Sequence, residues 1–204
     1  MPTLWEQLNA ELSPVVDRAR GALVQIHNGG QSFGAGTIWH ADGLIVTNAH
    51  VIAGRGALRV ALPEGRTLPA TVIASDPDRD LAALMVAASD LPTVELGDSR
   101  RLKPGQWVMA VGHPWGVAGA VTGGVVIGVG AGLPEIPRAH HEWIALDLHM
   151  RPGHSGGPLV DVAGRLVGIN TMIAGPDVGF AVPLHAVARF LKQTLAPAER
   201  APSR

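Results

Sequence analysis

Short apolar runs rich in β-branched residues follow one another along most of this chain. Turn signals such as "NGG", "ADG", "PEG" and "SDPD" separate them. Runs of this length, bounded by Gly, Pro, Asn and Asp, predict β-strands. No helical pattern interrupts the series between residues 22 and 182, which indicates an all-β sandwich or barrel.

The runs form two groups of six, separated by the polar joint "ELGDSRRLKPG" from Glu95 to Gly105. The first six strands are expected at Ala22–His27, Phe33–His40, Leu44–Thr47, Ala57–Leu62, Leu68–Ala74 and Leu81–Ala87. The second six are expected at Trp107–Gly112, Ala120–Val129, Trp143–Leu148, Pro158–Asp161, Arg165–Ile173 and Gly179–Val182. We therefore expect two packed six-stranded antiparallel β-barrels, with a ligand-binding cleft between them.

Helical patterns flank the strands. Apolar residues recur at helical spacing from Leu4 to Ala19, where Ser13 and Pro14 resemble a cap and a first helical position and so favour two short helices. A second pattern runs from Leu184 to Leu195. The predicted units are a helical segment (1–20), a first barrel (21–98), a second barrel (99–183), and a helix with a tail (184–204).

Composition excludes several classes of protein. The chain has 204 residues, 47% hydrophobic and 16% charged, as expected of a globular protein. Its net charge is −1 and its longest basic cluster is "SRR" at Ser99–Arg101, which argues against nucleic-acid binding. It has no cysteine, which excludes disulfides, a thiol nucleophile and cysteine-bound zinc. His140, His141 and His149 lack the spacing of a metal site, so we expect no metal and no cofactor.

Two apolar segments bear on location. Acidic residues interrupt the N-terminal segment, so it is not a signal peptide, and the chain as written predicts a cytoplasmic protein. An extracytoplasmic location follows if an export segment has been removed. Residues 117–133, "VAGAVTGGVVIGVGAGL", contain six glycines, which predicts a bent hairpin rather than a membrane span.

A serine stands among glycines and prolines in "RPGHSGGPLVD". Taken alone, this stretch fits a turn as well as it fits a nucleophile at Ser155. A serine nucleophile needs a neutral imidazole to accept its proton and a carboxylate to orient that imidazole. His50 follows an apolar strand in "GLIVTNAHVI", and Asp80 is the last acid before one in "SDPDRDLAALMV".

Each of these three residues has an ordinary explanation, as a packed histidine, a solvated turn acid and a loop serine. Together they stand in the order His, Asp, Ser, which is that of the chymotrypsin fold. His50 and Asp80 fall in the first predicted barrel and Ser155 in the second, so they would meet at the cleft. Gly153 and Gly156 let the backbone approach a substrate, and successive N–H groups there can bind an oxyanion.

Several motifs resemble the HtrA (high-temperature requirement A) serine proteases, a trypsin-like, two-barrel family. They are "GAGTIWHADGLIVTNAHVI", "DPDRDLAAL", "LGDSRRLKPGQWVMAVGHPWG", "PGHSGGPLVDVAGRLVGINTMI" and "VGFAVPL", and they cover nearly the whole chain. The resemblance implies that His50 is the general base, Asp80 its orienting carboxylate and Ser155 the nucleophile. It also implies that the backbone N–H groups of Gly153 and Ser155 hold the oxyanion.

The chain departs from the family where substrate would bind. His154 stands where Asn is usual, and "HPWG" at His113–Gly116 replaces Asn-Pro-Phe-Gly. By analogy with trypsin-like proteases, the specificity pocket is lined by Met150, Arg151, Thr171, Met172 and Ile173. The two methionines and the isoleucine predict a preference for small or medium aliphatic residues. Arg151 would favour a different side chain if it turned inward, and Thr171 is expected to hydrogen-bond Asp80.

The leading hypothesis is a serine endopeptidase that cleaves unfolded or damaged proteins through an acyl-enzyme. One alternative is a catalytically silent or gated protease fold that holds unfolded chains, and another is an esterase. The resemblance also implies a homotrimer formed through N-terminal aromatic residues such as Trp5, although a lone Trp on a helix more often packs on its own barrel. Family members usually continue into a PDZ domain, and none follows in this sequence.

Overall fold

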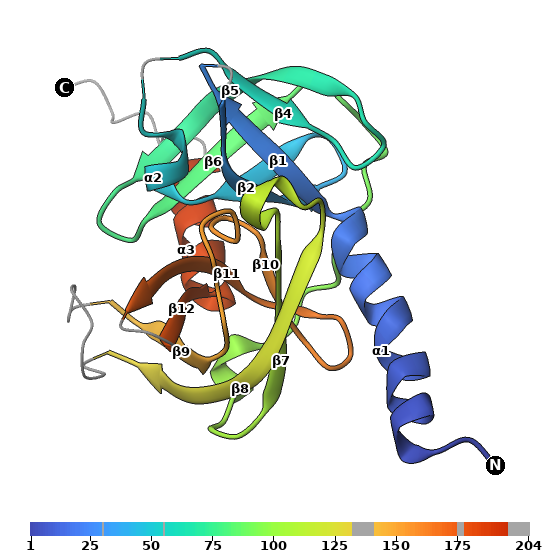
Figure 1. The fold of residues 1–204 in the computed structure, drawn as a ribbon. Helices are drawn as coiled ribbons and strands as arrows, with labels where there is room; N and C mark the ends of the chain where they lie inside the picture. The colour runs from blue at the N-terminus through green and yellow to red at the C-terminus, as the bar shows by residue number, and fades with distance from the viewer. Residues whose placement is uncertain (30, 55, 132–140, 175–177, 196–204) are drawn as a thin grey trace.

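A computed structural model describes residues 1–29, 31–54, 56–131, 141–174 and 178–195, without the side chains of 31–33 and 172–174. Two closed antiparallel barrels lie one above the other (Figure 1). The first has the strand order β1-β2-β3-β6-β5-β4, and the second has the same order read from β7, namely β7-β8-β9-β12-β11-β10. The predicted fold class, two packed six-stranded antiparallel barrels, is confirmed.

The strand bounds agree with the predicted runs to within a few residues. The first barrel contains β1 (Leu23–Asn28), β2 (Gln31–His40), β3 (Leu44–Thr47), β4 (Leu58–Ala61), β5 (Thr67–Asp76) and β6 (Leu81–Val86). The second contains β7 (Trp107–Gly112), β8 (Ala120–Gly130), β9 (Trp143–Asp147), β10 (Pro158–Asp161), β11 (Leu166–Ala174) and β12 (Val178–Pro183). The division of the chain into units at 1–20, 21–98, 99–183 and 184–204 stays a prediction.

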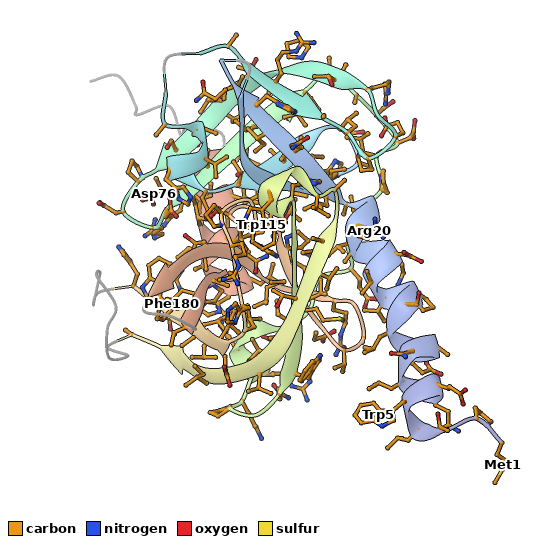
Figure 2. All side chains as sticks on the ribbon, viewed as in Figure 1. Met1, Trp5, Arg20, Asp76, Trp115 and Phe180 are labelled. Atoms are coloured by element: carbon orange, nitrogen blue, oxygen red, sulfur yellow. The ribbon has the colours of Figure 1, made fainter. Side chains whose placement is uncertain are left out.

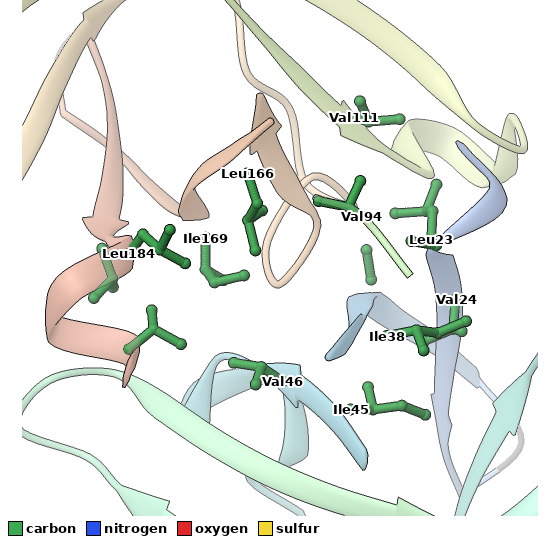
Figure 3. Packing of buried hydrophobic residues seen from close by; sticks show 14 of the residues in the cluster. Leu23, Val24, Ile38, Ile45, Val46, Val94, Val111, Leu166, Ile169 and Leu184 are labelled. Carbon is green, nitrogen blue, oxygen red and sulfur yellow. The ribbon is translucent and has the colours of Figure 1, made fainter. Parts of the chain in front are cut away.

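One hydrophobic cluster extends across both barrels, and a second lies within the second barrel. Figure 3 shows Leu23, Ile38 and Val46 of the first barrel packed near Val111 and Ile169 of the second, and all of them are buried. A continuous core that spans two barrels removes apolar surface of both from water. Their relative position is therefore fixed by packing, and with it the position of any site at their boundary.

The N-terminal helix α1 (Leu4–Gly21) is one helix, so the expected break at Ser13-Pro14 is wrong. Its C-terminal half is held by burial of Val15 and Ala19 in the core, and this packing offsets the hydrogen bond that Pro14 cannot donate. Its N-terminal half projects from the body of the molecule, with Trp5 near the free end (Figure 2). Trp5 is 72% exposed and does not pack on its own barrel.

The C-terminal helix α3 (Leu184–Leu195) is confirmed as predicted. It buries Leu184, Val187, Phe190 and Leu191, which recur at helical spacing and cover the shared core. A short helix, α2 (Ala49–Ile52), was not predicted, and it carries His50. None of the helices in the described part of the chain is long and apolar enough to cross a membrane.

Candidate active site

His50 and Asp80 meet at the edge of the first barrel. His50 lies on α2, directly after β3, and Asp80 directly precedes β6. Since β3 and β6 are antiparallel neighbours, the end of β3 and the start of β6 lie at the same edge of the barrel, and the two residues meet there. His50 Nδ1 lies 2.8 Å from Asp80 Oδ2, and the His50 backbone N–H donates to Asp80 Oδ1 at 3.0 Å.

Hydrogen bonds with Asn48, His50 and Thr171 hold Asp80 in place. Its φ of 53° lies in the left-handed region, which Asp adopts more readily than most residues. The Asn48 side-chain amide donates to its backbone carbonyl at 2.9 Å, and the Thr171 hydroxyl donates to Oδ2 at 2.5 Å. The Asp80 side chain is 10% exposed, whereas that of His50 is 51% exposed. The acid is thus fixed and buried while the imidazole reaches solvent.

These contacts set the charge of Asp80. Burial alone would raise its pKa, but hydrogen bonds from His50 and Thr171 and the charge of His50 outweigh burial and lower it. An ionised carboxylate only accepts hydrogen bonds, so His50 donates through Nδ1–H. With its proton on Nδ1, a neutral imidazole has an unprotonated Nε2 that can accept a proton.

Ser155 lies in the loop between β9 and β10, where two glycines shape the backbone. Gly153 has φ 107°, and a Cβ there would stand 2.5 Å from the carbonyl oxygen of His113. Gly156 has φ 85°, and a Cβ there would collide with the carbonyl of Ala35. Within the described residues, the backbone N–H groups of Gly153 and Ser155 have no acceptor, so both are available to an oxyanion.

The Ser155 hydroxyl donates to the backbone carbonyl of Thr171 at 2.7 Å. Among the residues that the structure describes, no hydrogen bond joins Ser155 to His50. Thr171 therefore binds two of the three predicted catalytic residues, Ser155 through its carbonyl and Asp80 through its hydroxyl. Ser155 and Asp80 are therefore close enough for a single residue of β11 to contact both.

Strand β2 of the first barrel supports the serine loop of the second. The Ala35 backbone N–H donates to the carbonyl of Ser155 at 2.8 Å, and the Thr37 hydroxyl donates to that of Gly156 at 3.1 Å. The sequence did not predict these hydrogen bonds from β2 or the hydrogen bond from Asn48 to Asp80. The small residues of "GAGT" and the Asn of "TNAH" were the available signals.

His154 is buried beside the nucleophile, 3% exposed. Its Nδ1 lies 3.1 Å from the Arg151 backbone nitrogen, and its buried Nε2 has no hydrogen-bond partner within the part of the chain that the structure describes. His113 directly follows β7 and donates its backbone N–H to the carbonyl of Gly153 at 2.8 Å. Burial lowers the pKa of both imidazoles, and their mutual repulsion adds to this at His113.

The residues predicted to line the specificity pocket lie in two groups. Met150 is 4% exposed, and its Cε would stand 2.6 Å from a Cβ on Gly179 of β12. Arg151 extends elsewhere, with its guanidinium carbon 5.5 Å from the centroid of the Trp115 ring. Thr171 contacts Ser155 and Asp80, as given above. The side chains of Met172 and Ile173 lie outside the described residues.

A second serine, histidine and acid meet away from the first group. Ser99 lies in the 3₁₀ turn η1 (Ser99–Arg101), His185 in α3, and Glu142 just before β9. Ser99 Oγ lies 2.8 Å from His185 Nδ1, and His185 Nε2 lies 2.7 Å from Glu142 Oε2. The hydrogen bond from His185 lowers the pKa of Glu142.

In the described part of the chain, no group of three or more His, Asp or Glu residues could hold a metal ion; His140 lies outside that part. A cavity of about 460 Å³ lies at the barrel boundary, lined by Arg79, Trp143, Val182 and Arg189 among others. His50, Asp80 and Ser155 are not among its lining residues.

Known proteins share this sequence and fold. The "Trypsin-like peptidase domain" family matches residues 34–169. A "Probable periplasmic serine endoprotease DegP-like" of Marinomonas sp. (strain MWYL1) is 44% identical over 149 residues, covering 73% of this chain and 31% of its own. A "Putative serine protease HhoB" of Synechocystis sp. is 39% identical over 159 residues, covering 76% of this chain and 38% of its own. This chain thus spans roughly a third of these relatives.

A solved structure described as "HtrA-type protease AlgW with tripeptide" superposes with a TM-score of 0.83 at 34% identity. The alignment covers 89% of this chain and 62% of that one. The relatives and the solved structure agree with the resemblance drawn from the motifs. The chain therefore belongs to the trypsin-like peptidase domain family, as a domain of the HtrA type.

Proposed function

We propose that this domain is a serine endopeptidase in which His50, Asp80 and Ser155 form the catalytic triad. The observation that carries the proposal is the pair of contacts made by Thr171, which hydrogen-bonds both Ser155 and Asp80 while Asp80 holds His50. Three residues with the chemistry of a triad, far apart in sequence, thus share one neighbourhood.

The chemistry follows from these contacts. Ser155 turns from the Thr171 carbonyl toward His50, and Oγ attacks the peptide carbonyl as its proton passes to His50 Nε2. The N–H groups of Gly153 and Ser155 bind the oxyanion. His50 then returns the proton to the leaving amine, which leaves an acyl-enzyme on Ser155. Water, deprotonated by His50, releases the acid and restores the serine.

We propose a preference for small or medium aliphatic residues before the scissile bond. Met150 fills the space over Gly179, which shortens any pocket formed between the serine loop and β12. A peptide series with Ala, Val, Leu, Phe or Lys at this position tests the proposal. Ala, Val and Leu peptides should be cleaved fastest, and Met150→Ala should shift the preference toward Phe.

Substrate, compartment and assembly are proposed from the family. Unfolded or damaged proteins are the proposed substrates. Because relatives are named as periplasmic, we propose that the domain works outside the cytoplasm. A homotrimer through the exposed Trp5 is proposed as well, and sedimentation velocity of wild type and Trp5→Ala tests it.

A gated or silent protease fold is the second candidate, since the Ser155 hydroxyl bonds Thr171 instead of His50. Intact-mass detection of a fluorophosphonate adduct decides between the two. An adduct on wild type but not on Ser155→Ala supports the peptidase, and one that forms only with denatured protein present indicates gating. If no adduct forms under either condition, the domain binds without cleaving. Comparing ester with peptide turnover tests the esterase.

A further inference from the structure

Trp115 occupies a position that neither packing nor backbone preference explains. It lies in the turn η2 (Pro114–Gly116) with φ 53° and ψ 23°, a left-handed conformation that bulky residues seldom adopt. Its side chain is 76% exposed, near the boundary of the two barrels (Figure 2). A strained backbone that holds a large aromatic ring in solvent suggests a role in binding.

Arg151 lies over that ring, 5.5 Å from its centroid to the guanidinium carbon. A guanidinium over an indole face is attracted by the ring and can still donate hydrogen bonds to a ligand through its N–H groups. In the described part of the chain, no carboxylate forms an ion pair with Arg151. The pair therefore presents a cation beside an aromatic ring, and among the described residues the guanidinium has no hydrogen-bond acceptor.

Both partners are joined to the loop that carries Ser155. His113, two residues before Trp115, donates its backbone N–H to the carbonyl of Gly153 at 2.8 Å. The Arg151 backbone N–H lies 3.1 Å from Nδ1 of the buried His154, which directly precedes Ser155. The backbones on either side of the pair are thus tied to the loop that contains the proposed oxyanion hole.

We propose that Arg151, stacked on Trp115, is a subsite that selects a carboxylate in the substrate close to the scissile bond. Guanidinium and carboxylate are both planar and pair through two parallel hydrogen bonds, which makes a carboxylate the favoured ligand. The carboxylate comes from an Asp or Glu side chain or from the terminus of a short peptide. This inference rests on the proposed peptidase function and names a feature of its substrates.

The test uses matched peptides that differ by one charge. A peptide with a good aliphatic residue at the cleavage site is made with Asp or Asn at each of the three positions on either side. The same peptides with a free or an amidated C-terminus distinguish the two sources of carboxylate. Wild type should cleave the Asp peptide roughly three- to tenfold faster in kcat/KM at one or more positions, or show the same preference for the free terminus.

Three variants assign the preference to the pair. Arg151→Gln should cleave Asp and Asn peptides equally, and Arg151→Glu should favour Lys over Asp. Trp115→Ala should weaken the preference, because the guanidinium loses its support. Arg59→Gln, which removes an exposed arginine on β4, should behave as wild type. The preference should also shrink in 1 M salt, where charges are screened within about 3 Å.

Equal cleavage of Asp and Asn peptides at every position, with no preference for a free terminus, would overturn the inference and leave the peptidase intact. A preference that survives in Arg151→Gln would do the same. If wild type cleaves no peptide, the proposed function fails first. Fluorescence anisotropy of the labelled peptides on Ser155→Ala then still decides, since tighter binding of the carboxylate-bearing peptide supports the subsite and equal binding refutes it.

Discussion

Two clusters in this domain contain a serine, a histidine and an acid, and the shorter, continuous hydrogen bonds belong to the cluster that we do not propose as the triad. Ser99, His185 and Glu142 form a continuous chain of hydrogen bonds of 2.8 and 2.7 Å. In the proposed triad only the His50–Asp80 bond is made, and Ser155 bonds elsewhere. We nevertheless expect Ser99, His185 and Glu142 to support the structure rather than to catalyse.

Exposure and orientation separate the two clusters. Ser99 is 1% exposed, and its oxygen also accepts the backbone N–H of His185 at 3.1 Å. Its acid bonds Nε2 and its serine bonds Nδ1, the reverse of the proposed triad. Around Ser155, by contrast, the described residues leave the backbone N–H groups of Gly153 and Ser155 and the Nε2 atom of His50 without a hydrogen-bond partner. A nucleophile requires access and an oxyanion site more than it requires short distances.

The largest expected effect on kcat comes from comparing the serines of the two clusters. Ser155→Ala should lower kcat by roughly a millionfold, because the nucleophile is lost. Ser99→Ala should leave kcat nearly unchanged and lower the free energy of unfolding by about 1–3 kcal/mol, because it leaves buried His185 atoms unpaired. Peptide turnover and urea unfolding of both variants provide the check. A large loss of turnover in Ser99→Ala would contradict the assignment.

The next largest difference in kcat is expected between variants of the two acids, Asp80 and Glu142. Asp80→Asn should lower kcat by roughly 10⁴, since an amide no longer holds His50 in the required tautomer. Glu142→Gln should retain activity, because the Gln carbonyl still accepts the hydrogen bond from His185 Nε2. Both changes replace a carboxylate with its amide, so each serves as the matched control of the other. Similar kcat values in the two variants would make Asp80 a structural acid.

Thr171 offers a smaller and more selective test. Thr171→Val removes the hydroxyl that bonds Asp80 but keeps the backbone carbonyl that bonds Ser155. Loss of one hydrogen bond to a charged group should lower kcat by roughly ten- to a hundredfold. Thr171→Ser should restore most of it. Steady-state kinetics of the pair measure the contribution, and equal losses in Val and Ser would point to packing instead.

The smallest effect concerns acid stability. Burial lowers the pKa values of His113 and His154 below those of the unfolded chain, so the unfolded chain binds more protons at mildly acidic pH. The stability they contribute is present above the unfolded pKa of about 6.5 and is lost as pH falls below it. His154→Asn should flatten the fall in the urea midpoint from pH 8 to 5. The exposed His40→Asn is the control, and an unchanged slope in His154→Asn would contradict the prediction.

Local patterns were enough to predict most of the fold. β-branched runs between turn residues predicted the twelve strands, because alternation and turn chemistry are properties of neighbouring residues. Pro14 shows the limit of this reasoning. A helix boundary expected from one residue was overridden by burial of Val15 and Ala19 against the barrels.

The sequence also predicted which residue types gather at the site, but not what supports them. Thr37 reaches Gly156 across 119 positions, and Ser99 reaches His185 across 86. No periodicity links residues at such separations, because only the packing of the two barrels brings them together. The exposure of Trp5 and the position of Arg151 over Trp115 depend on the same tertiary geometry.

The hydrogen bonds from β2 to the serine loop have a consequence for how the domain can be divided. The first barrel carries His50 and Asp80, and its Ala35 and Thr37 also hold the second barrel's Ser155 and Gly156. A cut in the joint between the barrels would therefore leave neither fragment with a complete catalytic centre. Two separately produced halves should be inert alone and should recover turnover only on reassembly, so activity would report directly on the union of the barrels.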